Sequence, residues 1–142
     1  MKIAIGSDHG GFLLKEEIKK YLLSNKYEVI DFGCDSLESV DYPVFARKVS
    51  ESVASKECDY GVLICTTGVG MCISANKIKG VRAVLGMNED MCQKSREHNN
   101  CNVLCLGAKY TDITKAKTYI EIFISTEFAG GRHERRVNMI EQ

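Results

Sequence analysis

The chain of 142 residues has no tryptophan, one proline and no net charge, because Lys plus Arg and Asp plus Glu each number 19. Proteins that bind nucleic acid or an anionic membrane need a basic surface, so the balanced charge argues against both partners. No apolar run is long enough to span a bilayer, and the N-terminus lacks the apolar stretch of a signal peptide. We therefore expect a cytoplasmic protein with no membrane or nucleic-acid partner.

Paired metal-binding and redox motifs are also missing. The seven cysteines form no Cys-x-x-Cys, and the three histidines do not pair with cysteines at zinc-finger spacing. An odd number of cysteines without a secretory signal indicates reduced thiols, most of which we expect to be small buried hydrophobic residues. The sequence therefore predicts no metal site.

Short apolar segments alternate along the chain with longer segments of helical period. The strand candidates are Lys2–Gly6, Tyr27–Asp31, Tyr60–Cys65, Arg82–Leu85 and Val103–Leu106. Helical period is present in Gly11–Asn25 and Thr111–Ser125, and Asp41 followed by Pro43 is a helix start signal, with Asp accepting the first free amides. The alternation predicts one domain over residues 1–142. Its expected fold is a Rossmann-like three-layer α/β/α sandwich with a five-stranded parallel sheet, strand order 2-1-3-4-5, and a C-terminal helix.

The segment Gly11–Asn25 also predicts which side chains face the core. Its apolar face consists of Leu14, Ile18, Tyr21 and Leu22. Its opposite, polar face consists of Lys15, Glu16, Lys19 and Lys20.

Two loops follow the first and third predicted strands. In a sheet of this order, ligands bind at the carboxyl ends of the strands where the strand order reverses, which is between these two strands. The loops cover residues 7–11, Ser-Asp-His-Gly-Gly, and residues 65–70, Cys-Thr-Thr-Gly-Val-Gly. Both contain reactive or anion-binding residues, so fold and residue chemistry predict a site at the same place.

The loop at residues 65–70 fits none of the common phosphate-binding patterns. A dinucleotide fingerprint would have a third glycine where Ile73 stands, and a cysteine phosphatase loop would have arginine where Met71 stands. The Gly-Lys-Ser/Thr of a P-loop is absent. Gly68 and Gly70 allow backbone amides to turn towards an anion, although a tight strand-to-helix turn has the same glycines. Cys65 is either inert core or a base or nucleophile activated by those amides.

Three further groups are candidates for the same chemistry. Asp8 and His9 end the first strand, where each alone would be a helix cap or an exposed loop residue. His98 ends the helix expected before the strand Val103–Leu106, and it is either a dipole-stabilising cap or an acid–base group. Arg132 and Arg136 share a helix face that suits a phosphate dianion, or belong to a solvated basic tail. Together these groups indicate proton abstraction next to a carbonyl through an enediolate.

Several longer motifs extend this pattern along the whole chain. They are Gly6–Phe12, Asp41–Pro43, Ile64–Gly70, Ala75–Lys77, Arg82–Ala83, Ser95–Asn99 and Gly130–Val137. In combination and in register, they resemble ribose-5-phosphate isomerase type B. The resemblance implies interconversion of ribose 5-phosphate and ribulose 5-phosphate in the non-oxidative pentose phosphate pathway, without metal or organic cofactor. It also implies a homodimer or homotetramer with active sites between subunits, where His98 and Asn99 come from the neighbouring subunit.

The resemblance also implies residue roles. Cys65 would be the base, with Thr67 and His98 assisting ring opening. The amides of the loop would hold the enediolate oxygen, with Asp8, Tyr42 and Asn99 on the sugar hydroxyls. The remaining substrate-binding positions would be Thr66, Gly68, Val69 and Gly70 in the loop and His9, Lys109, Arg132 and Arg136 at the phosphate.

Some positions depart from the family pattern. Thr66 stands where the family often has glycine, which narrows the loop but keeps the amide. Lys109 stands where many members have arginine. A lysine keeps the positive charge but lacks the guanidinium group that can bind a phosphate through two hydrogen bonds. Cys65 together with the lack of an acidic residue over 71–78 places the chain in the cysteine-base branch. A six-carbon substrate such as allose 6-phosphate, a non-catalytic nucleotide- or flavin-binding module and a thiol redox sensor remain alternatives.

Overall fold

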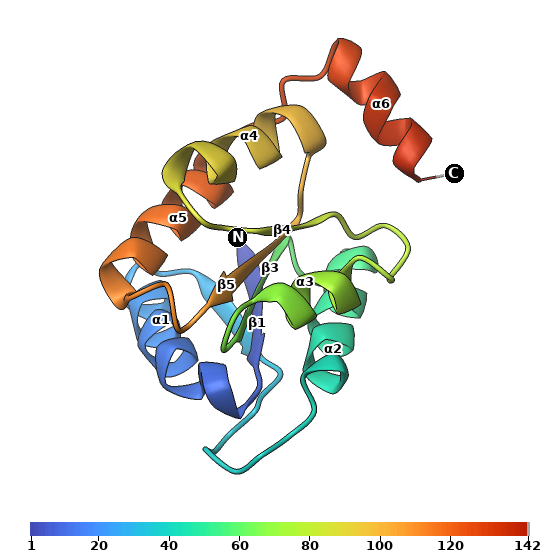
Figure 1. Cartoon of the computed structure of the whole chain (residues 1–142). Helices are drawn as coiled ribbons and strands as arrows, with labels where there is room; N and C mark the ends of the chain where they lie inside the picture. The colour runs from blue at the N-terminus through green and yellow to red at the C-terminus, as the bar shows by residue number, and fades with distance from the viewer. Residues whose placement is uncertain (142) are drawn as a thin grey trace.

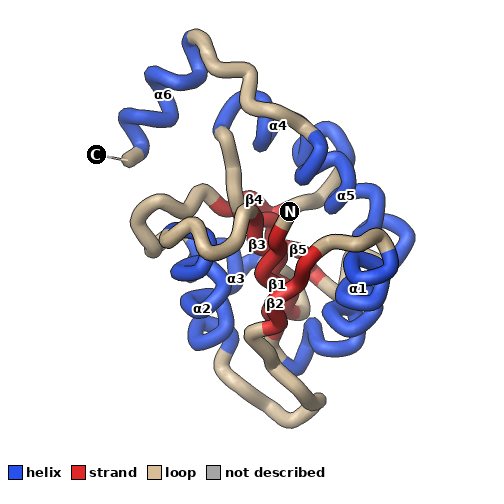
Figure 2. Tube along the Cα trace, turned by 180° about the vertical axis from the view of Figure 1, so that it is seen from behind, coloured by secondary structure: helices blue, strands red, loops and turns tan. Residues whose placement is uncertain are grey.

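A computed structural model describes residues 1–141 and contains a parallel sheet between two layers of helices (Figures 1 and 2). The strands are β1 (Lys2–Ser7), β2 (Glu28–Asp31), β3 (Tyr60–Cys65), β4 (Ala83–Leu85) and β5 (Val103–Gly107). The helices are the short 3-10 turn η1 (His9–Gly11), α1 (Phe12–Ser24), α2 (Tyr42–Ala54), α3 (Val69–Ala75), α4 (Glu89–Asn99), α5 (Ile113–Ser125) and α6 (Arg132–Ile140). Within residues 1–141, none of the helices combines the length and the apolar character that a membrane crossing requires. The predicted fold class is confirmed.

The predicted strand order is wrong at one edge of the sheet. The observed order is β2-β1-β3-β5-β4, so β5 lies between β3 and β4. A central parallel strand is covered on both faces and has to be apolar throughout. All five residues of β5 are buried, whereas the three residues of β4 are only half-buried, which suits an edge. The reversal of strand order still lies between β1 and β3, where the site was expected.

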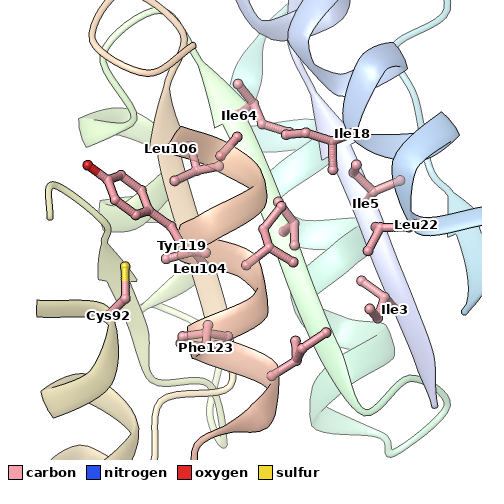
Figure 3. Close-up of a cluster of buried hydrophobic side chains, with 14 of the residues drawn as sticks. Ile3, Ile5, Ile18, Leu22, Ile64, Cys92, Leu104, Leu106, Tyr119 and Phe123 are labelled. Carbon is pink, nitrogen blue, oxygen red and sulfur yellow. The ribbon is translucent and has the colours of Figure 1, made fainter. Parts of the chain in front are cut away.

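The sheet buries a separate core on each face because successive side chains of a strand point to opposite sides. On one face, Ile3, Ile5 and Leu104 pack against α1, α4 and α5 (Figure 3). On the other face, Leu63 and Cys105 pack against α2 and α3. Six of the seven cysteines are buried and Cys72 is half-buried, which confirms that most of them act as core residues.

Lys15 does not belong to the polar face of α1 that the sequence predicts. Its side chain is only 1% exposed, and its Nζ lies 2.7 Å from Oδ2 of Asp31 at the end of β2. Burial favours the neutral form of Asp31, but hydrogen bonds from Lys15, Lys19 and the Gly33 amide outweigh it and lower the pKa of the carboxyl. An ion pair between α1 and β2 therefore replaces the expected contact of Lys15 with water.

The start of α2 is confirmed in position but not in mechanism. Asp41 is the N-cap residue and Pro43 lies in the first turn, as the sequence predicts. The carboxylate of Asp41, however, makes no hydrogen bond to the helix amides. The backbone carbonyl of Asp41 accepts the N–H of Val44 instead, at 3.3 Å.

Candidate active site

The loops after β1 and β3 meet at the carboxyl edge of the sheet. The N–H of Asp8 donates to the carbonyl of Ile64 at 3.3 Å, and the Asp8 carboxylate accepts the N–H of Gly11 at 3.2 Å. A Cβ at Gly11 would clash with the carbonyl of Ile64, and a Cβ at Gly10 would clash with Oγ1 of Thr66. The two glycines therefore allow the first loop to approach the loop that begins with Cys65, and Thr66 fits because Gly10 has no side chain.

Cys65 ends β3 and is almost fully enclosed, with 5% of its surface exposed. Its Sγ accepts the backbone N–H of Gly68 at 3.1 Å. An N–H donor aimed at sulfur stabilises negative charge there. The next amide, that of Val69, donates to Oγ1 of Thr67 at 3.3 Å. Two amides of the loop are thus engaged, and the first-turn amide of Gly70 is the next donor that could hold an oxyanion.

The loop after β5 forms a third wall beside Cys65. The N–H of Ala108 donates to the Cys65 carbonyl at 2.9 Å, and the N–H of Lys109 donates to the Thr66 carbonyl at 3.0 Å. The side chain of Lys109 is exposed. Next to this wall lies a cavity of about 400 Å³, which is lined by Thr67, Val69, Leu85, Gly86, Met87, Gly107 and Tyr110.

His9 and Tyr42 close the same edge of the sheet. Nδ1 of His9 accepts the N–H of Val40 at 3.2 Å, and since an amide can only donate, this nitrogen carries no proton. Nε2 is therefore the nitrogen that can donate to a ligand. The ring of Tyr42, at the first residue of α2, lies so close to Gly70 that a Cβ there would come within 2.6 Å of it. The structure thus gathers Asp8, His9, Tyr42 and the loop at residues 65–70 in one place.

A second group of predicted site residues lies at the opposite edge of the sheet. Because α4 begins after the carboxyl end of β4 and runs back, its last residues, His98 and Asn99, lie near the amino end of β5. Arg132 and Arg136 are exposed on α6, which contacts α4 and lies at the upper right of the view in Figure 1. One copy of the chain therefore does not bring these residues to Cys65.

Two residues that sequence reasoning did not assign hold this second group together. Arg82 donates from Nε to the Asn99 carbonyl at 3.0 Å and from Nη2 to the Asn100 carbonyl at 2.9 Å, and it also forms an ion pair with Glu141 after α6. The ring of His133 stacks on that of His98, with centroids 4.3 Å apart. Both residues belong to motifs that the sequence made visible, but only their contacts assign them a role.

The first group supplies a thiol, a carboxylate, an imidazole and directed backbone amides around one point. These are the groups that remove a proton next to a carbonyl and stabilise the resulting oxyanion. Within residues 1–141, no three His, Cys, Asp or Glu side chains are close enough together to hold a metal ion.

Comparison with known proteins gives a consistent result. The model of the ribose/galactose isomerase family matches residues 3–140. The ribose-5-phosphate isomerase B of Escherichia coli is 45% identical over 139 residues, which cover 98% of this chain and 93% of that protein. The solved structure of ribose-5-phosphate isomerase B from Clostridium thermocellum superposes with a TM-score of 0.98 at 50% identity, covering 99% of this chain and 95% of that one. The enzyme from Mycoplasma genitalium, solved with bound ribulose-5-phosphate, has a TM-score of 0.94 at 39% identity, with 99% and 93% covered.

Proposed function

The chain belongs to the ribose/galactose isomerase family, and from this membership we propose that it interconverts D-ribose 5-phosphate and D-ribulose 5-phosphate through an enediolate. The observation that carries the proposal is the position of Cys65, whose sulfur faces the Gly68 amide at the strand-order reversal. The similarity to a structure that binds ribulose-5-phosphate supports the substrate. We place the enzyme in the cytoplasm, in the non-oxidative pentose phosphate pathway.

In this proposal Cys65 acts as the base. Its thiolate removes the proton from C2 of the open-chain aldose, and the electron pair moves through the C1–C2 bond to the carbonyl oxygen, which gives the enediolate. The Cys65 thiol then returns the proton to C1, while the proton of the C2 hydroxyl moves to the C1 oxygen, so that C2 becomes the carbonyl of the ketose. The loop amides that are not engaged internally, such as that of Gly70, stabilise the oxyanion. Thr67 and His98 assist the opening of the sugar ring that precedes this step.

The other loop and tail residues bind the substrate. Asp8, Tyr42 and Asn99 contact the sugar hydroxyls. The phosphate is held by His9 through Nε2, by Arg132 and Arg136, and more weakly by Lys109, which lacks the fork of a guanidinium. Thr66, Gly68, Val69 and Gly70 line the reacting end of the sugar.

This distribution of roles needs a second copy of the chain. Cys65 and His98 lie at opposite edges of the sheet, so a complete site forms where the carboxyl edge of one copy meets the end of α4 of another. A two-fold axis makes this exchange mutual and produces two equal sites. We therefore propose a homodimer, alone or paired into a homotetramer, with its active sites between subunits.

The test is an activity panel of the wild-type protein and Cys65→Ala on ribose 5-phosphate and allose 6-phosphate. We expect turnover of ribose 5-phosphate, exchange of its C2 proton with solvent deuterium, and a loss of about 100- to 10,000-fold in Cys65→Ala. The matched control is Cys92→Ala, because Cys92 lies in the core on the opposite face and burial raises the pKa of its thiol to about 12.

The possible outcomes separate the alternatives. A fully active Cys65→Ala protein would reject Cys65 as the base. Turnover of allose 6-phosphate alone would assign a six-carbon substrate. Tight nucleotide binding by calorimetry without turnover of either sugar would indicate a non-catalytic module.

A further inference from the structure

The rings of His98 and His133 form a parallel stack at the amino edge of the sheet. Their centroids lie 4.3 Å apart and their planes differ by 11°. His98 lies in the last turn of α4 and His133 in the first turn of α6. The segment between α5 and α6 is tied to α4 by a hydrogen bond from the Ala129 N–H to the Glu97 carbonyl, at 3.0 Å. The stack is thus part of a built junction between the two helices.

The stack restricts the His98 ring while leaving it accessible. One face of each ring is covered by the other ring, and because both residues are half-buried, each keeps some exposed surface. Rotation of the His98 ring out of its plane would break the contact with His133. The nitrogens of His98 are therefore held in one plane before any ligand arrives.

The charges around the stack favour a neutral His133. Partial burial and the neighbouring His98 lower the pKa of His133 below its usual value of 6.5. Arg132 and Arg136 on α6 lower it further, and Glu97 on α4 opposes them. Two positively charged imidazolium rings in this arrangement would repel each other, which disfavours a positive charge on His133.

We propose that His133 is a positioning residue, which holds the His98 imidazole in the plane in which it meets the sugar ring of the substrate. The proposal rests on the proposed function, in which His98 assists ring opening in the active site shared with a second copy. Ring opening breaks the bond between C1 and the ring oxygen, while a proton leaves the anomeric hydroxyl and another reaches the ring oxygen. Such transfers depend strongly on the direction of the acid–base group, and a misplacement of about 1 Å can cost 100-fold in rate.

The experiment compares His133→Ala with His133→Phe, which restores a flat ring in place of the imidazole. The control is Arg135→Ala, because Arg135 is exposed on the same helix and has no proposed role. For ribose 5-phosphate we expect a loss in kcat of about 10- to 100-fold in His133→Ala with little change in KM. We expect recovery of most of that loss in His133→Phe and no change in the control.

A second readout separates positioning from general damage to the site. Ribulose 5-phosphate is acyclic, because its C5 oxygen carries the phosphate, so its conversion to the enediolate requires no ring opening. Deuterium incorporation from solvent into ribulose 5-phosphate should therefore proceed at the wild-type rate in His133→Ala. An equal fall in deuterium incorporation and in ribose 5-phosphate turnover would overturn the proposal, as would an unchanged kcat.

The stack itself can be measured without substrate. The chain has three histidines, so their ring resonances can be assigned in an NMR pH titration with single variants. We expect His133→Ala to shift the His98 resonances and His98→Phe to raise the pKa of His133, because the charge of His98 is removed. Absence of both changes would overturn the proposal. A wild-type protein that is inactive on ribose 5-phosphate but shows both changes would reject the proposed function and leave the stack intact.

Discussion

The backbone N–H of Gly68 points at the thiol sulfur of Cys65 across 3.1 Å. This relationship requires an unusual backbone, because Gly68 has a φ of +79° in the left-handed region. It also requires a residue without a side chain, since a Cβ at Gly68 would lie 2.5 Å from Cδ1 of Leu85 and 2.9 Å from the carbonyl carbon of Leu106. The position of the proposed base is thus set by a glycine three residues away.

Gly68→Ala should lower kcat on ribose 5-phosphate by about 100-fold or more, because the loop must shift away from Cys65 to relieve the contact with Leu106. The control is Gly80→Ala. Gly80 also has a positive φ, +89°, but a Cβ there would meet nothing closer than 3.8 Å. Left-handed backbone should cost both variants about 1 to 2 kcal/mol of unfolding free energy, measured by urea denaturation. Equal activity of the two variants would contradict the role of Gly68.

Two inactive variants should restore each other's activity if the active sites are shared. Cys65→Ala and His98→Ala each remove one half of the proposed site. When the two proteins are unfolded together at equal amounts and refolded, half of the dimers are mixed, and each mixed dimer contains one intact site. About a quarter of the wild-type activity per site should therefore return. If the mixture stays as inactive as its components, Cys65 and His98 do not act in the same shared site.

Asp31→Asn should destabilise the protein by about 3 kcal/mol, because it removes the closer carboxylate from the buried ammonium of Lys15 and leaves that of Glu16 at 3.7 Å. The matched control is Lys19→Met. Lys19 contacts the same carboxylate at 2.8 Å, but its side chain is 30% exposed, so its loss should cost about 1 kcal/mol or less. Both values follow from urea denaturation at neutral pH, and equal losses would contradict the special position of Lys15.

The same ion pair predicts a pH dependence of stability. The pKa of Asp31 is lower in the folded protein than its ordinary value of 3.8. The stabilisation by Asp31 is therefore complete above about pH 4 and is lost as the pH falls through the lower, folded-state pKa. The free energy of unfolding should fall more steeply below pH 4 in the wild type than in Asp31→Asn.

Among the thiols of Cys72, Cys92 and Cys101, that of Cys72 should react first with iodoacetamide in the folded protein. A hydrogen bond with the thiol of Cys105 lowers the pKa of Cys72 to about 7, and burial opposes this shift. Burial raises the pKa of Cys92 to about 12 and that of Cys101 to about 11. Mass spectrometry after brief labelling should show Cys72 modified at a rate that rises through pH 7, while the other two remain unmodified. Labelling of Cys92 at the same rate would contradict this order.

The fold class and one half of the candidate site could be predicted from the sequence because both depend on local patterns. Apolar runs and helical periods mark the strands and helices, and the carboxyl ends of parallel strands share one edge of the sheet. The meeting of Asp8 with the loop after Cys65 follows from this rule. The roles of the individual site residues stay predictions until they are measured.

Three features were decided only by the tertiary structure. The position of β5 between β3 and β4 depends on which strand is apolar enough to be covered on both faces, which is a competition between segments. The burial of Lys15 depends on Asp31, which belongs to β2. The residue spacing within α1 therefore cannot predict it. The stacking of His133 on His98 depends on how α6 packs on α4.

The sequence by itself determined that Cys65 lies at the reversal of strand order. It also placed glycines in the two loops there, which allow the loops to approach each other closely. It determined this because strand direction and loop position follow from short-range periodicity along the chain. The tertiary structure decided that the Gly68 amide points at the sulfur and that His98 lies at the far edge. Distances between elements depend on the packing of the whole core, which short-range patterns do not encode.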